Sequence, residues 1–188
     1  MSSACRRTFS TRVGHWRQTA TSLMLLMVLA GAENFSFAQT VRIGLTGPFT
    51  GGSSPMGESM RNGVRLAVDE INSAGGIQGI PIELIERDDT ADEKVGAKIA
   101  EELTRSKVVA TIGVVNTGVG LASIDHYQRA RIPLIVAVST GPMLTRKFAP
   151  PAAAANYIFR VSPTLDLEAR VLAADLKKKI ADARGTVR

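Results

Sequence analysis

The sequence is poor in the side chains that build covalent cross-links, metal sites and thiol catalysts. It holds one cysteine, Cys5, and two histidines, His15 and His126. Cys5 and His15 both lie within an N-terminal segment that has the features of a removable leader. Without that segment the chain has no cysteine and one histidine. This excludes disulfides, thiol catalysis and sites built from clusters of cysteine and histidine, so we expect no metal site.

The hydrophobic run near the N-terminus is too short to span a bilayer. Leu23–Ala30 is eight residues long, whereas a membrane-spanning helix needs about 20. Four arginines precede the run, and the small residues Ser36 and Ala38 follow it at the spacing of a cleavage site. We therefore predict a secretory signal peptide over residues 1–38, cut before Gln39, and a periplasmic location. The pair Arg6-Arg7 leaves the twin-arginine export route open beside the ordinary one.

A surface of one charge is also lacking. The formal net charge is +6, and half of it comes from residues 1–38, with four arginines and one acid. The remaining charges are mixed in sign along the chain, apart from Lys177–Lys179. A nucleic-acid surface needs a clustered basic stripe, so we expect no nucleic-acid partner. The three lysines suit the last turns of a helix, where the helix dipole favours positive charge.

Apolar patterning predicts five strands and four helices in near alternation. The strands are expected at Val41–Leu45, Ile82–Arg87, Val108–Val115, Leu134–Val138 and Tyr157–Val161. The helices are expected at Met60–Ile71, from Thr90 past Leu103, at Thr117–Ala130 and at about Leu165–Arg184. Such alternation predicts the α/β class, with a doubly wound parallel sheet of about five strands flanked by helices. Ligands in this architecture bind outside the carboxyl ends of the strands.

Several local signals refine this expectation. Pro81 and the charges that follow it suit an edge strand, whereas Val108–Val115 and Leu134–Val138 resemble strands buried on both faces. Thr90–Glu93 matches a helix capping box. Ser162 is a candidate N-cap, followed by Pro163 at the first helical position. The last helix has one apolar face, formed by Leu165, Ala169, Leu172, Leu176 and Ile180.

The turn after the third strand is the best candidate for binding an anion. Thr117 and Gly118 lie where this strand gives way to a helix, whose first backbone amides are unpaired and whose dipole is positive. The hydroxyl of Thr117 and the bare backbone of Gly118 suit a carboxylate. Thr117 or Asn116 serving only as a helix N-cap explains the same residues, and the sequence leaves both interpretations open.

The turn after the fourth strand offers complementary groups. Ser139 and Thr140 carry hydroxyls, and the carbonyl of Val138 together with the Thr140 hydroxyl suits a ligand ammonium. A plain polar turn remains the alternative. The acids Asp88 and Asp89 are better explained by the turn that begins the next helix than by acid–base or metal chemistry.

A nucleotide-binding enzyme is disfavoured. The glycines of Gly44–Gly47 do not have the G-x-G-x-x-G spacing, and Pro48 follows them. An exported protein also meets little NAD or ATP. We therefore expect no enzyme activity and no cofactor.

The block Ala67–Gly79, with its Gly-Gly-Ile-Gln-Gly ending, and the following Ile82–Asp89 resemble the leucine/isoleucine/valine-binding proteins. Further matches are Ile112-Gly113 before a hydroxyl-bearing turn, and Ser139-Thr140 before Pro142. The resemblance covers Val41 to about Arg188. The family consists of periplasmic substrate-binding proteins of ABC transporters, in which two lobes close on a ligand such as an amino acid, an amide or an aromatic acid.

The resemblance implies roles for individual residues. Thr117 takes the position that holds the ligand carboxylate, Val138 gives a backbone contact, and Thr140 binds the amino and carboxylate ends. Met56 stands where leucine-type members often place an aromatic residue over the ligand side chain, which leaves the ligand's identity open. The site residues expected are therefore Met56, Thr117, Gly118, Val138, Ser139 and Thr140.

The resemblance also implies an organisation for the whole chain. Residues 39–188 correspond to an N-terminal lobe that is incomplete at its C-terminal end, so the second lobe is expected to be missing. A monomer that delivers its ligand to a membrane permease is the expected function. Two alternatives stay open: a non-functional truncated remnant, and an exported ligand sensor that shares the same lobes.

Overall fold

The structure, a computed structural model, describes residues 39–185, so the predicted signal peptide at 1–38 lies outside the described residues. One parallel sheet holds five strands in the order β2-β1-β3-β4-β5. The strands are β1 (Val41–Gly47), β2 (Ile82–Asp88), β3 (Ala110–Gly113), β4 (Leu134–Val136) and β5 (Ile158–Arg160). This order confirms the doubly wound sheet and the edge position of Ile82–Asp88.

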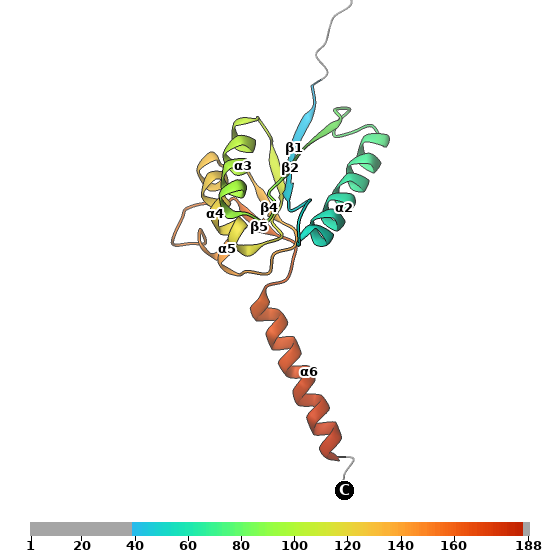
Figure 1. Cartoon of the computed structure of the whole chain (residues 1–188), viewed down its shortest axis with the longest axis vertical. Coiled ribbons are helices and arrows are strands. Elements are labelled where there is room, and N and C mark those ends of the chain that lie inside the picture. The colour runs from blue at the N-terminus through green and yellow to red at the C-terminus, as the bar shows by residue number, and fades with distance from the viewer. Residues whose placement is uncertain (1–38, 186–188) are drawn as a thin grey trace, which may run out of the picture. The chain divides into compact units, whose positions relative to one another are not determined.

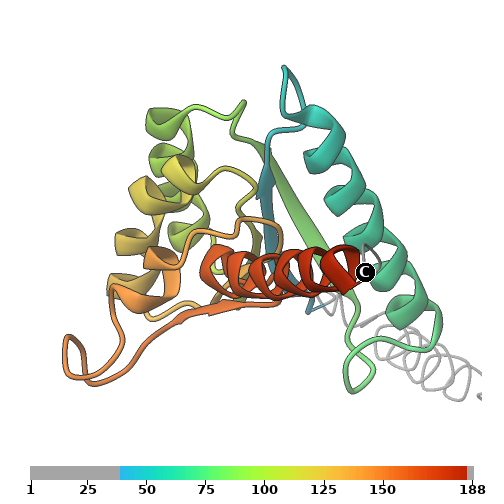
Figure 2. The same cartoon turned by 90° about the horizontal axis from the view of Figure 1, so that it is seen from below.

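Helices cover both faces of the sheet. Helix α2 (Ser54–Ser73) lies on one face, and α3 (Glu93–Arg105) and α4 (Thr117–Ala130) pack together on the other, as Figures 1 and 2 show. The short α5 (Met143–Arg146) joins β4 to β5 beside α4. In the sheet, β2 lies on one side of β1 and β3 lies on the other. Right-handed crossovers from β1 to β2 and from β2 to β3 therefore place α2 and α3 on opposite faces.

The core is best developed on the face of the sheet that α3 and α4 cover. Leu134, Val136 and Ile158 point from β4 and β5 toward Ile124 and Tyr127 of α4, and all five are at most 2% exposed. Full burial of such side chains stabilises the fold by roughly 1.5–3 kcal/mol each. This cluster holds α4 against β4, and thereby fixes the start of α4 next to the loop that follows β4.

The opposite face is only partly covered, because α2 is the single helix that packs on it among the described residues. Leu45 of β1 and Met60 of α2 are buried in one cluster, but Phe159 on β5 is 50% exposed. An apolar groove of about 770 Å³ runs between α2 and the sheet. The prediction that Leu134–Val138 is buried on both faces is therefore wrong, since no helix within residues 39–185 covers β4 and β5 on this side.

Helix α6 (Leu165–Gly185) contributes nothing to the core. Every side chain from Leu167 to Ala183 is exposed, including the apolar face predicted for this helix. The predicted cap is also wrong, because α6 begins at Leu165 and not at Pro163. The Ser162 hydroxyl instead donates to the carbonyl oxygen of Ser139 at 2.7 Å. None of the helices in residues 39–185 is both long enough and apolar enough to cross a membrane.

The cap of α3 also differs from the prediction. The helix begins at Glu93, and Asp92 is its N-cap, with a carboxylate that accepts hydrogen bonds from the amides of Lys94 at 2.8 Å and Val95 at 2.9 Å. Thr90 has a positive φ of 51° and lies two residues outside the helix. The capping box expected at Thr90–Glu93 is therefore wrong, although the helix starts where this signal lies.

Candidate functional site

The loops that follow β1, β3 and β4 meet at the carboxyl edge of the sheet. The side-chain amide of Asn116, after β3, donates to the hydroxyl of Ser53, after β1, at 3.3 Å. The hydroxyl of Thr117 lies 2.8 Å from that of Ser139, after β4. This edge lies at the switch point of the sheet, where the chain passes from β2 on one side of β1 to β3 on the other side. Ligands of doubly wound folds bind at such a switch point.

Asp88 holds the loop after β1 in place. Its carboxylate accepts hydrogen bonds from the Thr50 hydroxyl at 2.6 Å, from the Phe49 amide at 2.9 Å and from the Thr90 amide at 2.9 Å. Partial burial opposes ionisation, but these hydrogen bonds outweigh it and lower the pKa of Asp88. The acid has the structural role in a turn that its sequence position suggests.

The neighbouring acid, Asp89, is buried and only 1% exposed. Its carboxylate accepts from the amide of Ala91 at 3.0 Å and lies 3.5 Å from the hydroxyl of Thr46. Burial raises the pKa of Asp89, and the neighbouring charge of Asp88 adds to the effect. Within residues 39–185 no group of acids, cysteines and histidines is suited to hold a metal ion.

The start of α4 presents unpaired backbone donors. The N-cap is Asn116, whose side chain makes no cap hydrogen bond, and the first backbone bond of the turn joins the Gly120 amide to the Asn116 carbonyl. The amides of Thr117 and Gly118 therefore have no acceptor within the helix. The alternative that Thr117 is the N-cap is wrong, since this position belongs to Asn116.

Two hydroxyls meet where the loop after β4 reaches the first residue of α4. Thr117 and Ser139 share one hydrogen bond of 2.8 Å, so one of the two hydroxyl hydrogens remains free to donate to another group. Gly141 packs close to Thr117, and a Cβ added at Gly141 would clash with the Thr117 side chain. The loop after β4 thus lies directly against the first turn of α4.

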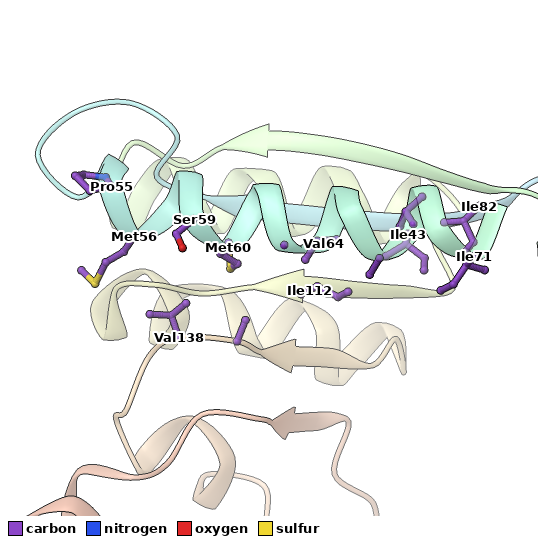
Figure 3. Close-up of a pocket in the computed structure, with 14 residues that line it drawn as sticks. Ile43, Pro55, Met56, Ser59, Met60, Val64, Ile71, Ile82, Ile112 and Val138 are labelled. Carbon is purple, nitrogen blue, oxygen red and sulfur yellow. The ribbon is translucent and has the colours of Figure 1, made fainter. Parts of the chain in front are cut away.

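The other expected site residues divide between this edge and the groove. Val138 and Met56 line the apolar groove from opposite walls (Figure 3), and Met56 is 53% exposed. No hydrogen bond to the Val138 carbonyl is present in the described part of the chain. The carbonyl of Thr140 accepts a hydrogen bond from the Leu165 amide at 3.0 Å. The hydroxyl and the amide of Thr140 have no protein partners among the described residues.

Sequence reasoning missed three residues at this edge. Glu93, in the first turn of α3, lies against Gly118, where an added Cβ would meet its carboxylate. The Ser53 hydroxyl accepts a hydrogen bond from the Asn116 side chain. Arg160 donates to the carbonyls of Ser139 and Gly141 in the loop after β4. Of these three residues, only Arg160 could have been suspected from the sequence. An arginine at the end of a short apolar strand is rarely buried without a hydrogen-bond or charge partner.

The arrangement can bind a small molecule with charges of both signs. Backbone amides at a helix start, a free hydroxyl hydrogen and the helix dipole favour a carboxylate. The free carbonyl of Val138 lies one residue from Ser139 and is a suitable acceptor for an ammonium group. Apolar atoms of Met56 and Val138 line the groove, and Val138 directly precedes Ser139 in the chain.

Comparison with known proteins identifies the family of the chain. The periplasmic binding protein family matches residues 40–184 of the chain. The Leu/Ile/Val-binding protein homolog 2 of Brucella abortus is 34% identical over 122 residues, which are 65% of this chain and 33% of the relative. The chain thus spans about a third of the length of this relative.

Solved structures agree with the sequence comparison. The branched-chain amino acid transporter substrate binding protein LivJ of Streptococcus pneumoniae, in complex with isoleucine, matches with 31% identity and a TM-score of 0.61, covering 67% of this chain and 34% of that one. A solute binding protein of an ABC transporter from Rhodopseudomonas palustris, in complex with 3,4-dihydroxy benzoic acid, has 29% identity and a TM-score of 0.58, covering 67% and 32%. The chain therefore belongs to the periplasmic binding protein family, among relatives that include Leu/Ile/Val-binding proteins.

Proposed function

We propose that residues 39–188 form the N-terminal lobe of an extracytoplasmic substrate-binding protein that serves an ABC transporter. In this proposal residues 1–38 direct export to the periplasm, by the ordinary or the twin-arginine route. The lobe works as a monomer and presents its bound ligand to a membrane permease. Membership of the periplasmic binding protein family over residues 40–184 supports the substrate-binding role.

The ligand is a branched-chain amino acid or a related small carboxylate or amide, including aromatic acids. The observation that carries this proposal is the pair of hydroxyls on Thr117, the first residue of α4, and Ser139, which lie 2.8 Å apart. The ligand carboxylate binds to these groups, the Gly118 backbone and Thr140. An ammonium group, where the ligand has one, binds to the carbonyl of Val138.

The side chain of the ligand lies toward Met56. Because methionine is unbranched and flexible, Met56 adapts to aliphatic and to aromatic groups better than a fixed aromatic ring. Relatives with similar folds have been solved with isoleucine and with 3,4-dihydroxy benzoic acid. These two ligands share a carboxylate and differ in the rest, which agrees with a site whose carboxylate end is fixed by the backbone.

Isothermal titration calorimetry of the purified chain with leucine, isoleucine, valine and 3,4-dihydroxybenzoate tests the proposal. We expect heat of binding with at least one of them. Thr117→Val, which keeps the side-chain shape but removes the hydroxyl, weakens that binding by about tenfold or more, the effect of losing a hydrogen bond to a charged group. Thr104→Val is the matched control, because Thr104 bonds to the Glu101 carbonyl near the end of α3.

The result has two ways to contradict the proposal. If the chain melts cooperatively but binds none of the four compounds, the assigned ligand class is wrong. Equal affinities for the wild type and Thr117→Val overturn the assigned site while leaving the ligand class in place.

A further inference from the structure

Arg160 occupies an unusual position for a charged side chain. It ends β5, and its guanidinium faces four oxygen atoms that carry no formal charge: the carbonyls of Gly141 at 2.5 Å, Ser139 at 3.2 Å and Pro163 at 3.4 Å, and the Thr145 hydroxyl at 3.3 Å. No ion pair of Arg160 with an acid is present in the described part of the chain. The side chain thus joins the loop after β4 to the connection that leads into α6.

The carbonyls that Arg160 binds belong to the candidate ligand loop. The Ser139 carbonyl accepts from Arg160 and also from the Ser162 hydroxyl at 2.7 Å. In a planar trans peptide the carbonyl and the following N–H point in opposite directions. Holding the Ser139 carbonyl toward β5 therefore turns the amide of Thr140 away from β5.

The next peptide is held in the same way. The Thr140 carbonyl accepts from the Leu165 amide at 3.0 Å, so the Gly141 amide points away from the start of α6. This amide lies 3.5 Å from the Ser139 hydroxyl, which in turn contacts Thr117. The Gly141 amide thus faces the hydroxyl that contacts Thr117, while the carbonyls of Ser139 and Gly141 face Arg160 and that of Thr140 faces the start of α6.

We propose that Arg160 is a positioning residue that orients the Ser139–Gly141 peptides toward the ligand and couples their orientation to the connection into α6. This proposal rests on the proposed function, because the coupling acts on the same candidate site. Coupling between two sites is reciprocal: a ligand that binds the oriented loop also favours the Ser162–Leu165 geometry that supports it. Arg160 touches no ligand and acts through the backbone.

Two readouts on the full chain test the proposal. The first is hydrogen exchange of the Leu165 amide, measured by NMR without ligand, with the Leu134 amide in the sheet as internal reference. The second is the affinity for isoleucine. We expect Arg160→Gln to speed exchange at Leu165 by about tenfold or more and to weaken binding by about tenfold, while exchange at Leu134 stays unchanged.

Conservative variants separate positioning from general stability. Arg160→Lys restores part of both effects, because an ammonium can still donate to one or two of the carbonyls. Ser162→Ala removes the second donor to the Ser139 carbonyl and shifts both readouts in the same direction by a smaller amount. Should Arg160→Gln fail to fold, these two variants decide the question. Arg129→Gln on the exposed side of α4 is the matched control and changes neither readout.

Unchanged exchange at Leu165 in all three variants overturns the proposal. So does faster exchange at Leu134 in step with Leu165, which is the mark of a residue that only stabilises the fold. If the wild-type chain binds no isoleucine, the proposed ligand class fails, and exchange at Leu165 alone then decides whether Arg160 orients the loop.

Discussion

Two neighbouring acids, Asp88 and Asp89, show how strongly the surroundings of a single residue decide its chemistry. Asp88 receives three hydrogen bonds and has a lowered pKa, whereas Asp89 is 1% exposed and has a raised pKa. The distance of 3.5 Å to the Thr46 hydroxyl is too long for a strong hydrogen bond, so the Ala91 amide is the main partner of Asp89. A charged Asp89 is therefore poorly compensated.

This difference predicts a stabilising substitution, Asp89→Asn. Because burial raises the folded-state pKa of Asp89, its favourable contribution is complete below the unfolded-state pKa and is lost as the pH rises through the folded-state pKa. Asparagine keeps the acceptor for Ala91 and never ionises. We expect the variant to be more stable than wild type at pH 7 by about 1 kcal/mol, in urea unfolding monitored by circular dichroism.

The advantage of Asp89→Asn is expected to vanish at about pH 2.5, more than one unit below the unfolded-state pKa of about 3.9, where both the folded and the unfolded wild type hold the proton. Asp88→Asn is the opposite control and destabilises at pH 7, because its hydrogen bonds favour the charged form. A variant at Asp89 that is less stable than wild type by the same amount at both pH values would show that its carboxylate is well compensated.

Among the helices and strands, the start of α3 gives the sharpest test. Asp92→Ala removes the side chain that accepts from the amides of Lys94 and Val95, and we expect a loss of about 1 kcal/mol of unfolding free energy. Loss of the negative charge at the helix start adds to the effect. Chemical denaturation at pH 7 measures it.

Thr90→Ala is the control for the start of α3, because the sequence favoured Thr90 as the cap and the structure does not. Its hydroxyl makes no cap bond, and Ala at this position is expected to stay within about 0.5 kcal/mol of wild type. A larger loss for Thr90→Ala than for Asp92→Ala would restore the capping box that the sequence suggested.

The sequence predicted the strands and helices well but not how they end and pack. Alternating and continuous apolar runs can be recognised from local sequence, and all five strands and their parallel arrangement were confirmed. Caps depend on single dihedral angles, such as the positive φ of Thr90, which composition does not reveal. Whether a strand such as Leu134–Val136 is covered on both faces depends on segments far away in the chain.

The site was predictable to the extent that topology alone fixes it. The carboxyl ends of β3 and β4 are neighbours in a doubly wound sheet, so the sequence brought Thr117 and Ser139 to one edge. The contacts of Arg160 and Glu93 were not predictable, because they depend on the path of loops after the strands. The ligand roles of Met56, Val138 and Thr140 remain predictions.

At the scale of the whole molecule, residues 39–185 leave much apolar surface uncovered. The groove between α2 and the sheet exposes atoms of Met56 and Ile71, and α6 exposes a stripe that includes Leu172 and Ile180. Soluble proteins rarely expose contiguous apolar patches larger than a few hundred Å². An apolar fluorescent dye that reports exposed hydrophobic surface is therefore expected to bind the folded chain.

The groove is expected to be the main site of this dye, because it is concave and encloses about 770 Å³, whereas a single exposed helix contacts a dye from one side only. Ala67→Lys places a charge in the groove wall and is expected to lower the dye fluorescence by about half. Leu66→Lys is the matched control, because Leu66 lies on the same helix at 62% exposure and does not line the groove. Loss of the signal in Leu172→Lys instead would assign the dye to α6 and leave the groove without an apolar ligand.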